Sequence, residues 1–319
     1  MPSVSDHLRK NMFAIANIVL PVFALIVAGY ILRRRNILSL NASTELNRYV
    51  VWLALPALMI DVMVNSSWSE LYQPEFFYAF ELGVFIIFFA VLALHWLKTK
   101  NLVSAAIDAT SASYANTGYI GLPLCALTFG ADKLGPAMVA AILTVSANFA
   151  VSIIFIEAGS QTGKSLFVTF RNVGISLCRN PLIVAPVLAG LFCATGLQLP
   201  YGVAQSIKLL GASASPCALV ATGLFLAQRQ ESASPGVAIW LVVLKLVAQP
   251  LIAWYFAFCV FDMPPLWAHS AVILSALPTG TGPFMLAELY GRGGGIASRT
   301  IFLSTVLGIV TLSVCLTLL

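Results

Sequence analysis

Two stretches of this sequence interrupt long apolar runs with glycine, proline and small polar residues. Residues 114–123 read YANTGYIGLP, and residues 277–283 read LPTGTGP. Proline removes a backbone donor and clashes with the preceding helical turn, and glycine weakens a helix by about 1 kcal/mol. A single proline in such a run, as at Pro56, is equally well explained by a kink that shapes packing. Two clusters that also hold Asn and Thr predict helices that break for a functional reason.

The composition of the chain requires a lipid environment. Hydrophobic residues make up 60% of the 319 residues, and charged residues only 9%. Soluble proteins carry about 25% charged residues, so this chain lacks the polar residues to cover an apolar interior. The six cysteines lie singly in apolar runs, which is typical of small buried side chains and not of a disulfide framework. A soluble enzyme, a disordered protein and a secreted disulfide-rich protein are therefore excluded.

Apolar runs of the length that crosses a bilayer recur along the chain. A helical crossing needs about 20 apolar residues, and the first run, which begins near Met12, is too long for the core of a signal peptide. The pattern predicts an all-α polytopic membrane protein with ten transmembrane helices. The expected spans are residues 12–32, 46–64, 76–97, 102–129, 135–157, 175–196, 203–227, 237–261, 266–290 and 297–319.

The basic residues predict how the chain is oriented in the membrane. Of the 17 Lys and Arg residues, twelve lie in the connections that follow the odd-numbered spans, and three (Arg9, Lys10 and Lys133) lie on the opposite side. Connections rich in Lys and Arg stay in the cytoplasm, so both termini are expected outside it. The net charge of +5 therefore reports orientation, and no nucleic-acid partner is expected.

The two halves of the chain carry the same features in the same order. The Asn-Thr-Gly at 116–118 precedes Gly130, and the Pro-Thr-Gly at 278–280 precedes Gly291 at nearly the same spacing. Repeats of five spans enter the membrane from opposite sides, and broken spans in corresponding places of inverted halves mark the midplane site of a carrier. We expect spans 4 and 9 to cross there at their breaks. The predicted units are inverted repeats at 1–157 and 175–319, joined by a cytoplasmic linker at 158–174.

Four stretches carry a resemblance to a known family. They are residues 116–123 (NTGYIGLP), 179–181 (RNP), 216–226 (PCALVATGLFL) and 276–291 (ALPTGTGPFMLAELYG). At these residues the sequence resembles the auxin efflux carrier family, which includes plant auxin exporters and bacterial organic-acid permeases. Plant members carry a long hydrophilic loop between the halves, whereas only about 17 residues lie there in this chain. The resemblance is therefore to the short bacterial type, which implies the bacterial cytoplasmic (inner) membrane.

The resemblance implies a mechanism, an assembly and a set of site residues. It implies an elevator-like secondary carrier, in which spans 1, 2, 6 and 7 form a scaffold and spans 3–5 and 8–10 form a mobile transport domain. It also implies a homodimer. In the family, the Asn-Thr pair of span 4 and the proline break of span 9 line the substrate site. Those positions map onto Asn116, Thr117, Pro123, Pro278 and Thr279.

The breaks give an independent reason to expect an anionic substrate. A broken helix exposes the N–H groups of its second half, whose macrodipole is positive at that end, and glycine lets the backbone approach a ligand. We expect a small carboxylate or dicarboxylate between these ends, with no Lys or Arg at the centre. Asn148 is also a candidate, although it equally suits a bond to a neighbouring helix. The predicted substrate-binding residues are Asn116, Thr117, Gly118, Tyr119, Pro123, Asn148, Pro278, Thr279, Gly280 and Thr281.

Ionisable residues inside a membrane are candidates for function. The candidate sites for a coupling proton or sodium ion are Asp61, Asp108 and Glu288. Each of these also suits a helix end or an aqueous interface. Glu81 and Lys245 suit a mutual pair or snorkelling side chains, and His95 suits the interface.

Other functions fit the sequence less well. Residues 158–165 (AGSQTGKS) match a loose phosphate-loop pattern, but a working loop joins a strand to a helix in an α/β domain. We therefore expect no nucleotide, cofactor or metal site and no enzyme, and transport that runs on gradients. A sodium-coupled symporter that resembles the bile-acid type ranks second. Hard cations prefer oxygen-rich sites, and the sequence has few carboxylates near the expected crossing. A membrane sensor or intramembrane enzyme ranks third, since neither an output domain nor a protease motif is evident.

Overall fold

The chain folds into helices that run back and forth across the molecule. The computed structural model describes residues 4–39, 41–67, 71–160, 166–228, 235–292 and 294–318. In these ranges, seven helices are long and apolar enough to cross a membrane: Asn17–Arg34, Ala42–Val64, Pro74–Thr99, Gly135–Gly159, Tyr201–Leu226, Gly236–Val260 and Gly295–Leu318. The predicted class, an all-helical multi-pass membrane protein, is confirmed.

Several crossings contain a π-helical turn (η) between α-helical segments. The elements, in chain order, are α1 (Val4–Arg34), α2 (Ala42–Tyr49), η1 (Val50–Ala54), α3 (Leu55–Val64), α5 (Pro74–Thr99), α6 (Leu102–Ser113), η2 (Thr117–Gly121), α7 (Leu122–Phe129), α8 (Gly135–Leu143), η3 (Thr144–Asn148), α9 (Phe149–Gly159), α10 (Leu166–Arg179), α11 (Pro181–Ala194), α12 (Tyr201–Leu226), α13 (Pro235–Val243), η4 (Leu244–Ala248), α14 (Gln249–Trp254), η5 (Tyr255–Val260), α15 (Pro265–Ser275), α16 (Gly282–Leu289) and α17 (Gly295–Leu318).

The span predicted at 175–196 is wrong at its start. α10 continues to Arg179, and α11 begins only at Pro181. The Asn180 Oδ1 atom accepts a hydrogen bond from the Leu182 N–H at 3.0 Å, and proline has no N–H to leave unpaired in a first turn. The predicted linker therefore contains most of a helix, α10. Residues 161–165 of the phosphate-loop-like stretch lie outside the described residues.

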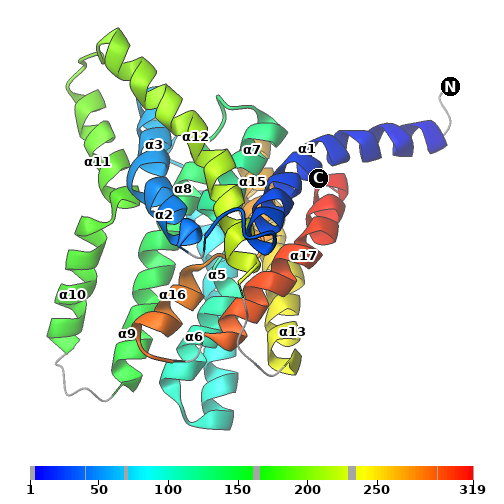
Figure 1. The fold of residues 1–319 in the computed structure, drawn as a ribbon, viewed down its shortest axis with the longest axis vertical. Coiled ribbons are helices and arrows are strands. Elements are labelled where there is room, and N and C mark those ends of the chain that lie inside the picture. Colours follow the sequence, from blue (N-terminus) through cyan, green and yellow to red (C-terminus); the bar gives the residue numbers. More distant parts are fainter. Residues whose placement is uncertain are drawn as a thin grey trace.

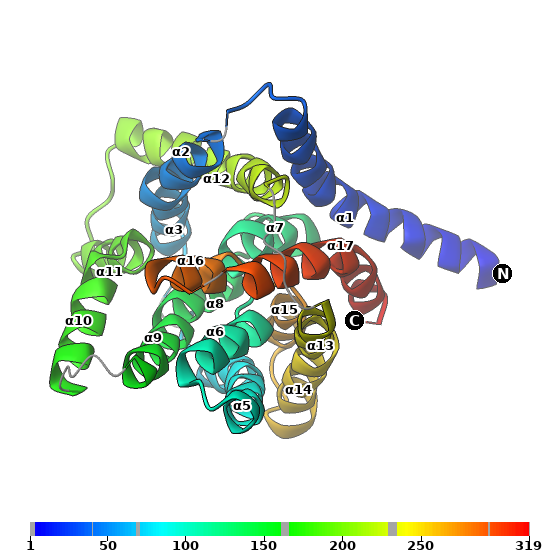
Figure 2. The same ribbon diagram turned by 60° about the horizontal axis from the view of Figure 1, so that its bottom comes forward.

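The helices pack in two groups, which we call the panel and the crossing bundle. The panel consists of α1, α2, η1, α3, α11 and α12, and the crossing bundle of α5–α9 and α13–α17. In the panel, α12 packs along α1, α2 and α3, and α3 packs along α11; in the crossing bundle, α5 packs along α6, α14 and α15, and α6 along α9. Figures 1 and 2 show α1, α2 and α12 on one side and α5 and α6 on the other, with α16 and α17 between them in Figure 2.

Glycine permits the closest helix contact of the panel. A Cβ atom at Gly29 of α1 would lie 2.2 Å from the Val220 carbonyl oxygen of α12, and one at Gly223 of α12 would lie 1.9 Å from the Ile26 carbonyl oxygen of α1. These separations are far below van der Waals contact, so only glycine fits at either position. Small residues allow transmembrane helices to approach in this way.

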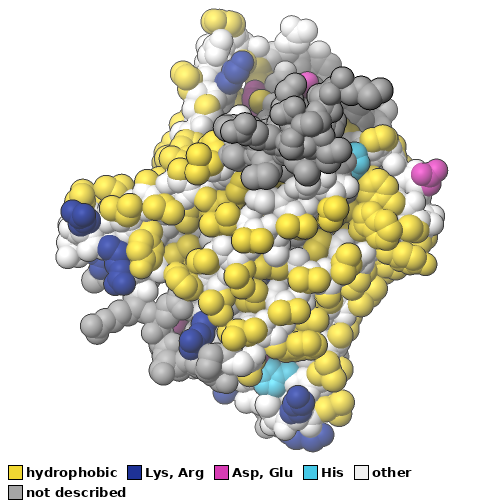
Figure 3. All heavy atoms as spheres, turned by 90° about the vertical axis from the view of Figure 1, so that its right-hand side faces the viewer, with side chains coloured by type: hydrophobic (Ala, Val, Ile, Leu, Met, Phe, Trp, Pro, Cys, Tyr) yellow, Lys and Arg dark blue, Asp and Glu magenta, His cyan; other side chains and the backbone are white. Residues whose placement is uncertain are grey.

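The outer surface is apolar over a broad band. Figure 3 shows hydrophobic side chains over the middle of one face, with Lys and Arg gathered toward the edges of the view. Large apolar residues such as Leu251 of α14 and Val310 of α17 are exposed. Water disfavours such a surface, whereas lipid tails solvate it.

Candidate functional site

The two predicted helix breaks are present, and they meet. α6 ends at Ser113 and α7 begins at Leu122, while α15 ends at Ser275 and α16 begins at Gly282. Ala115 and Thr279 form an isolated antiparallel β-bridge. The Asn116 N–H donates to the Pro278 carbonyl at 2.9 Å, and the Gly280 N–H donates to the Tyr114 carbonyl at 3.0 Å. Each broken stretch thus provides hydrogen-bond partners for backbone groups of the other. Lipid offers no such partners, so a helix can break inside a membrane only where protein or water provides them.

This pairing uses a backbone amide that was expected to face a ligand. The Gly280 N–H lies at the expected start of the second half-helix of span 9, but it is used in the bridge between the breaks. Thr279 is also engaged, because its hydroxyl donates to the Ser111 carbonyl at 2.9 Å and its N–H donates to the Ser304 Oγ atom at 3.0 Å. Thr279 is fully buried. It therefore holds the crossing together and has no free donor.

The prolines and glycines of the breaks have structural positions. Pro283 lies in the first turn of α16, where a missing N–H costs nothing, whereas Pro123 lies one turn inside the helix that η2 and α7 form together. Pro278 lies in the break itself and packs against Gly308 of α17, where an added Cβ would lie 3.6 Å from the proline ring. An added Cβ at Gly282 would lie 2.7 Å from the Tyr114 ring, so the ring and the start of α16 pack tightly.

A lysine reaches the crossing, although the sequence predicted no Lys or Arg there. Lys245 of η4 is fully buried, and its Nζ atom donates to the Ser275 carbonyl at the end of α15, at 2.7 Å. Gln249, one helical turn further along, donates from Nε2 to the Ser113 carbonyl at the end of α6, at 3.2 Å. Two side chains of one span thus bond the C-terminal ends of both first half-helices. These ends are the negative ends of the helix dipoles.

The partner predicted for Lys245 does not bind it. Glu81 and Lys245 are both buried and both described, and the structure shows no ion pair between them. Neither carboxylate oxygen of Glu81 has a hydrogen-bond partner.

Three buried amide side chains near the breaks have atoms without partners. The Nδ2 atom of Asn116, both side-chain polar atoms of Asn148 and the Oε1 atom of Gln249 lack a hydrogen-bond partner, although Asn116 and Asn148 are only 6% and 1% exposed. Unpaired buried polar groups are rare in native proteins and call for an explanation. A ligand that accepts or donates hydrogen bonds at these amides is such an explanation. Thr117, the neighbour of Asn116, is also buried.

A polar cavity of about 180 Å³ lies between the panel and the crossing bundle. Of the predicted site residues, Tyr119 and Thr281 line it. The residues that line it are Ser43, Thr44, Asn47, Tyr119, Ala221, Thr222, Phe225, Gln228, Thr281, Phe284 and Met285. Sequence reasoning missed the polar residues from α2 and α12, and no local motif marks them.

The boundary between the two groups at this cavity is largely apolar. The rings of Phe225 in the panel and Phe284 in the crossing bundle lie 5.0 Å apart, and the space beside Gly118 is occupied by Leu55, 3.7 Å from where a Cβ would be. Among the side-chain hydrogen bonds given for the described residues, one joins the groups, from the Tyr119 hydroxyl to the Asn47 Oδ1 atom. The other interhelical side-chain hydrogen bonds described here each lie within one group.

A larger cavity of about 420 Å³ is not a candidate for this site. It lies on the outside of the crossing bundle, between α14 and α17, and its lining is apolar apart from Thr311 and Cys315.

The three predicted coupling residues lie in different places. Asp108 of α6 is buried and pairs with His95 of α5, with 2.7 Å between its Oδ2 atom and Nδ1. Asp61 of α3 is partly exposed and accepts a hydrogen bond from the Asn65 side chain at 3.2 Å. Glu288 of α16 is exposed. Only Asp108 is thus held in the interior by a partner, and that partner is the histidine expected at the interface.

Comparison with known proteins gives a consistent result. A family model described as "Membrane transport protein" matches residues 14–316. A Rhizobium meliloti (strain 1021) protein named "Putative malonate transporter" is 28% identical over 304 residues, 95% of this chain and 95% of that protein. An uncharacterized transporter of Escherichia coli (strain K12) is 24% identical over 238 residues, 73% of this chain and 75% of that protein. Auxin efflux carrier component 8 of Arabidopsis thaliana is 27% identical over 152 residues, 47% of this chain and 41% of that protein.

Proposed function

Because this chain belongs to the family of membrane transport proteins, we propose that it is a secondary carrier that moves a small organic anion across the bacterial cytoplasmic membrane. The chain is a multi-pass membrane transporter and not an enzyme. The observation that carries the proposal is the crossing of two broken helices beside a polar cavity. Helix breaks of this kind hold the substrates of secondary carriers near the bilayer midplane.

The charges and donors around the crossing favour an anion. Lys245 is a buried basic residue whose partner is an uncharged carbonyl oxygen, and the residues that line the cavity include no Asp or Glu. α16 begins at the cavity edge, with Thr281 and Phe284 in the lining, and a helix start attracts negative charge. The Asn116 amide supplies an unused donor. The relative named for malonate is in line with a small carboxylate or dicarboxylate.

The packing favours an elevator mechanism with ten spans in inverted repeats. A twofold relation between the repeats exchanges span 1 (α1) with span 6 (α11) and span 2 (α3) with span 7 (α12). If α1 packs against α12, the same relation requires α11 to pack against α3, and both pairs do pack closely. The panel would be the scaffold and the crossing bundle the moving domain. Their boundary suits sliding, because its described part combines apolar contacts with the Tyr119–Asn47 hydrogen bond. With the orientation given by the basic residues, both termini lie outside the cytoplasm.

The donors on η4 and α14 argue against the sodium-coupled alternative. In broken-helix carriers, the C-terminal ends of half-helices coordinate the coupling cation. Here the carbonyls of Ser275 and Ser113 already accept hydrogen bonds from Lys245 and Gln249. A sodium ion would have to displace the Lys245 amino group at the Ser275 carbonyl, or the Gln249 amide at the Ser113 carbonyl.

Ligand-induced stabilisation of the purified protein tests the proposed site. A ligand at 100 times its Kd stabilises a protein by about 2.7 kcal/mol, so malonate and related carboxylates should raise the unfolding temperature in detergent. Asn116→Ala should remove this shift, while Asn65→Ala, which alters an exposed amide at the end of α3, should keep it. A shift that survives in Asn116→Ala would contradict the site.

A further inference from the structure

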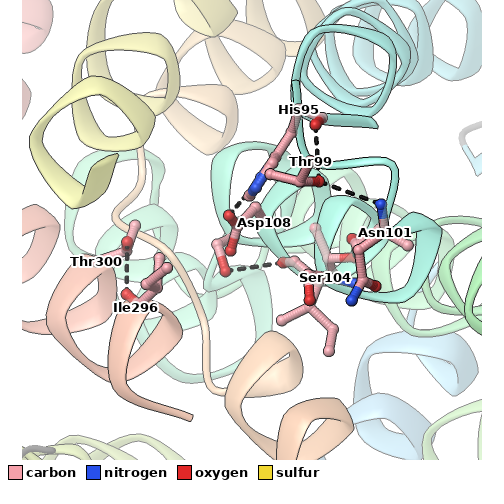
Figure 4. Close-up of polar contacts among 11 residues, drawn as sticks. His95, Thr99, Asn101, Ser104, Asp108, Ile296 and Thr300 are labelled. Atoms are coloured by element: carbon pink, nitrogen blue, oxygen red, sulfur yellow. Dashed lines mark hydrogen bonds and ion pairs between the residues drawn. The ribbon is translucent and has the colours of Figure 1, made fainter. Parts of the chain in front are cut away.

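A histidine and an aspartate form a buried pair inside the crossing bundle. His95 of α5 points to Asp108 of α6 (Figure 4), and the Nδ1 and Oδ2 atoms are 2.7 Å apart. The Asp108 side chain is 4% exposed and the His95 side chain 21% exposed. Water therefore reaches the pair through the imidazole, and a proton can enter there without exposing the carboxylate.

The pair is connected to the crossing through a single short helix. α6 carries Asp108, and the last turn of the same helix provides the carbonyls of Ser111 and Ser113, which bond Thr279 and Gln249. A rigid helix moves as a unit, so the pair and the crossing travel together whenever the crossing bundle moves. The start of α6 is fixed by Asn101, whose Oδ1 atom accepts a hydrogen bond from the Ser104 N–H at 3.0 Å (Figure 4).

Other charged groups around the pair lie at the helix ends or have partners of their own. Tyr290 donates to Glu157 at 2.8 Å, and Glu288 is exposed. Glu81 lies near the opposite end of α5, and Lys245 bonds the end of α15. The other titratable side chains toward this end of α5, α6 and the helices that pack against them are Lys98, Lys100, Glu157, Glu288, Tyr290, Arg292 and Arg299.

A proton on the pair offsets the charge of a bound anion. An anion and a proton that enter the crossing bundle together add no net charge to its buried interior. Either one alone adds a net charge, which a low-dielectric membrane disfavours.

We propose that the His95–Asp108 pair binds the proton that travels with the anion, so that transport is proton symport. This inference rests on the proposed carrier function. The proton passes from water to the imidazole, remains there while the loaded crossing bundle moves, and leaves to water on the other side. The electroneutral cycle moves one proton with one monoanion, which for a dicarboxylate is its singly protonated form.

Two assays on the full chain in proteoliposomes separate proton coupling from substrate exchange. Counterflow of labelled malonate at equal pH requires no net proton movement, whereas accumulation driven by a pH gradient does. We expect His95→Gln and Asp108→Asn to lose gradient-driven accumulation more than tenfold and to lose the malonate-induced alkalinisation of the proton-supplying side. Both variants should still catalyse counterflow.

Matched variants complete the test. His269→Gln, which alters a histidine on α15, should leave both assays unchanged, and Asp61→Asn and Glu288→Gln should retain gradient-driven accumulation. Accumulation that follows the pH gradient in His95→Gln or Asp108→Asn as in the unmodified protein would overturn the proposal. If Asp108→Asn fails to fold, His95→Gln and the proton-to-malonate ratio of the unmodified protein decide. Counterflow by an unmodified protein that shows no accumulation driven by a pH gradient contradicts this inference alone, whereas absence of counterflow contradicts the carrier function.

Discussion

Replacement of Thr279 by valine should weaken the crossing without changing its shape. Thr279→Val conserves the volume of a fully buried side chain and removes the hydrogen bond from its hydroxyl to the Ser111 carbonyl, 2.9 Å in length. A carbonyl left buried without that partner costs about 1–3 kcal/mol, and interhelical hydrogen bonds in membranes fall toward the lower end of this range. We therefore expect a loss of about 1–2 kcal/mol in the free energy of unfolding, roughly a 5–30-fold change in the folded-to-unfolded ratio.

Equilibrium unfolding in mixed micelles, followed by tryptophan fluorescence, measures this loss. The matched control is Thr305→Val on α17, because the Thr305 hydroxyl bonds the Ile301 carbonyl of its own helix at 2.7 Å. That carbonyl belongs to a helical turn and keeps its backbone partner, so the control should change the free energy by less than about 0.5 kcal/mol. If Thr279→Val is no more destabilising than Thr305→Val, the reasoning that the hydroxyl joins the two breaks is refuted.

Three further outcomes follow from the same contacts. Gly29→Ala should destabilise the panel by more than about 2 kcal/mol, because its Cβ would lie 2.2 Å from the Val220 carbonyl oxygen. Gly202→Ala is the control, since the space around Gly202 is open, and equal unfolding temperatures of the two variants would contradict the packing. Tyr119→Phe removes the hydrogen bond to Asn47, so it should shift the equilibrium between the two positions of the crossing bundle by about 1 kcal/mol, roughly fivefold. The rate of maleimide labelling at Thr281→Cys reports this shift, and an unchanged rate would show that the bond does not favour one position. Lys245→Met should weaken malonate binding, measured by calorimetry, more than tenfold, whereas Lys208→Met, which alters an exposed residue, should not. Equal affinities of the two variants would show that Lys245 takes no part in anion binding.

The helix breaks could be predicted because their cause is local. Proline and glycine act on the helical turn in which they lie, so residues 114–123 and 277–283 show the interruption in the sequence itself. The composition likewise predicts a membrane protein, because charge content determines which solvent a surface suits. Helix starts were less predictable. The Asn180 cap and Pro181 mark the start of α11, but the apolar run around them reads as continuous.

The side-chain partners at the site could not be predicted, because they depend on how separate spans pack. Lys245 reaches the end of α15 across 30 residues of sequence, and Gln249 reaches Ser113 across 136. The cavity-lining residues of α2 and α12 have no motif for the same reason. The His95–Asp108 pair did have a signal, since α5 ends at Thr99 and α6 begins at Leu102. A connection this short folds the two helices into a hairpin and places residues on either side of the turn next to each other.

Counterflow of labelled malonate in proteoliposomes tests the central claim most directly. A carrier that holds a small anion at the crossing exchanges internal malonate for labelled malonate at equal pH without sodium, ATP or a membrane potential. We predict saturable exchange that is lost in Asn116→Ala and retained in Asn65→Ala. The absence of exchange of malonate and other small carboxylates by the folded, unmodified protein would contradict the account.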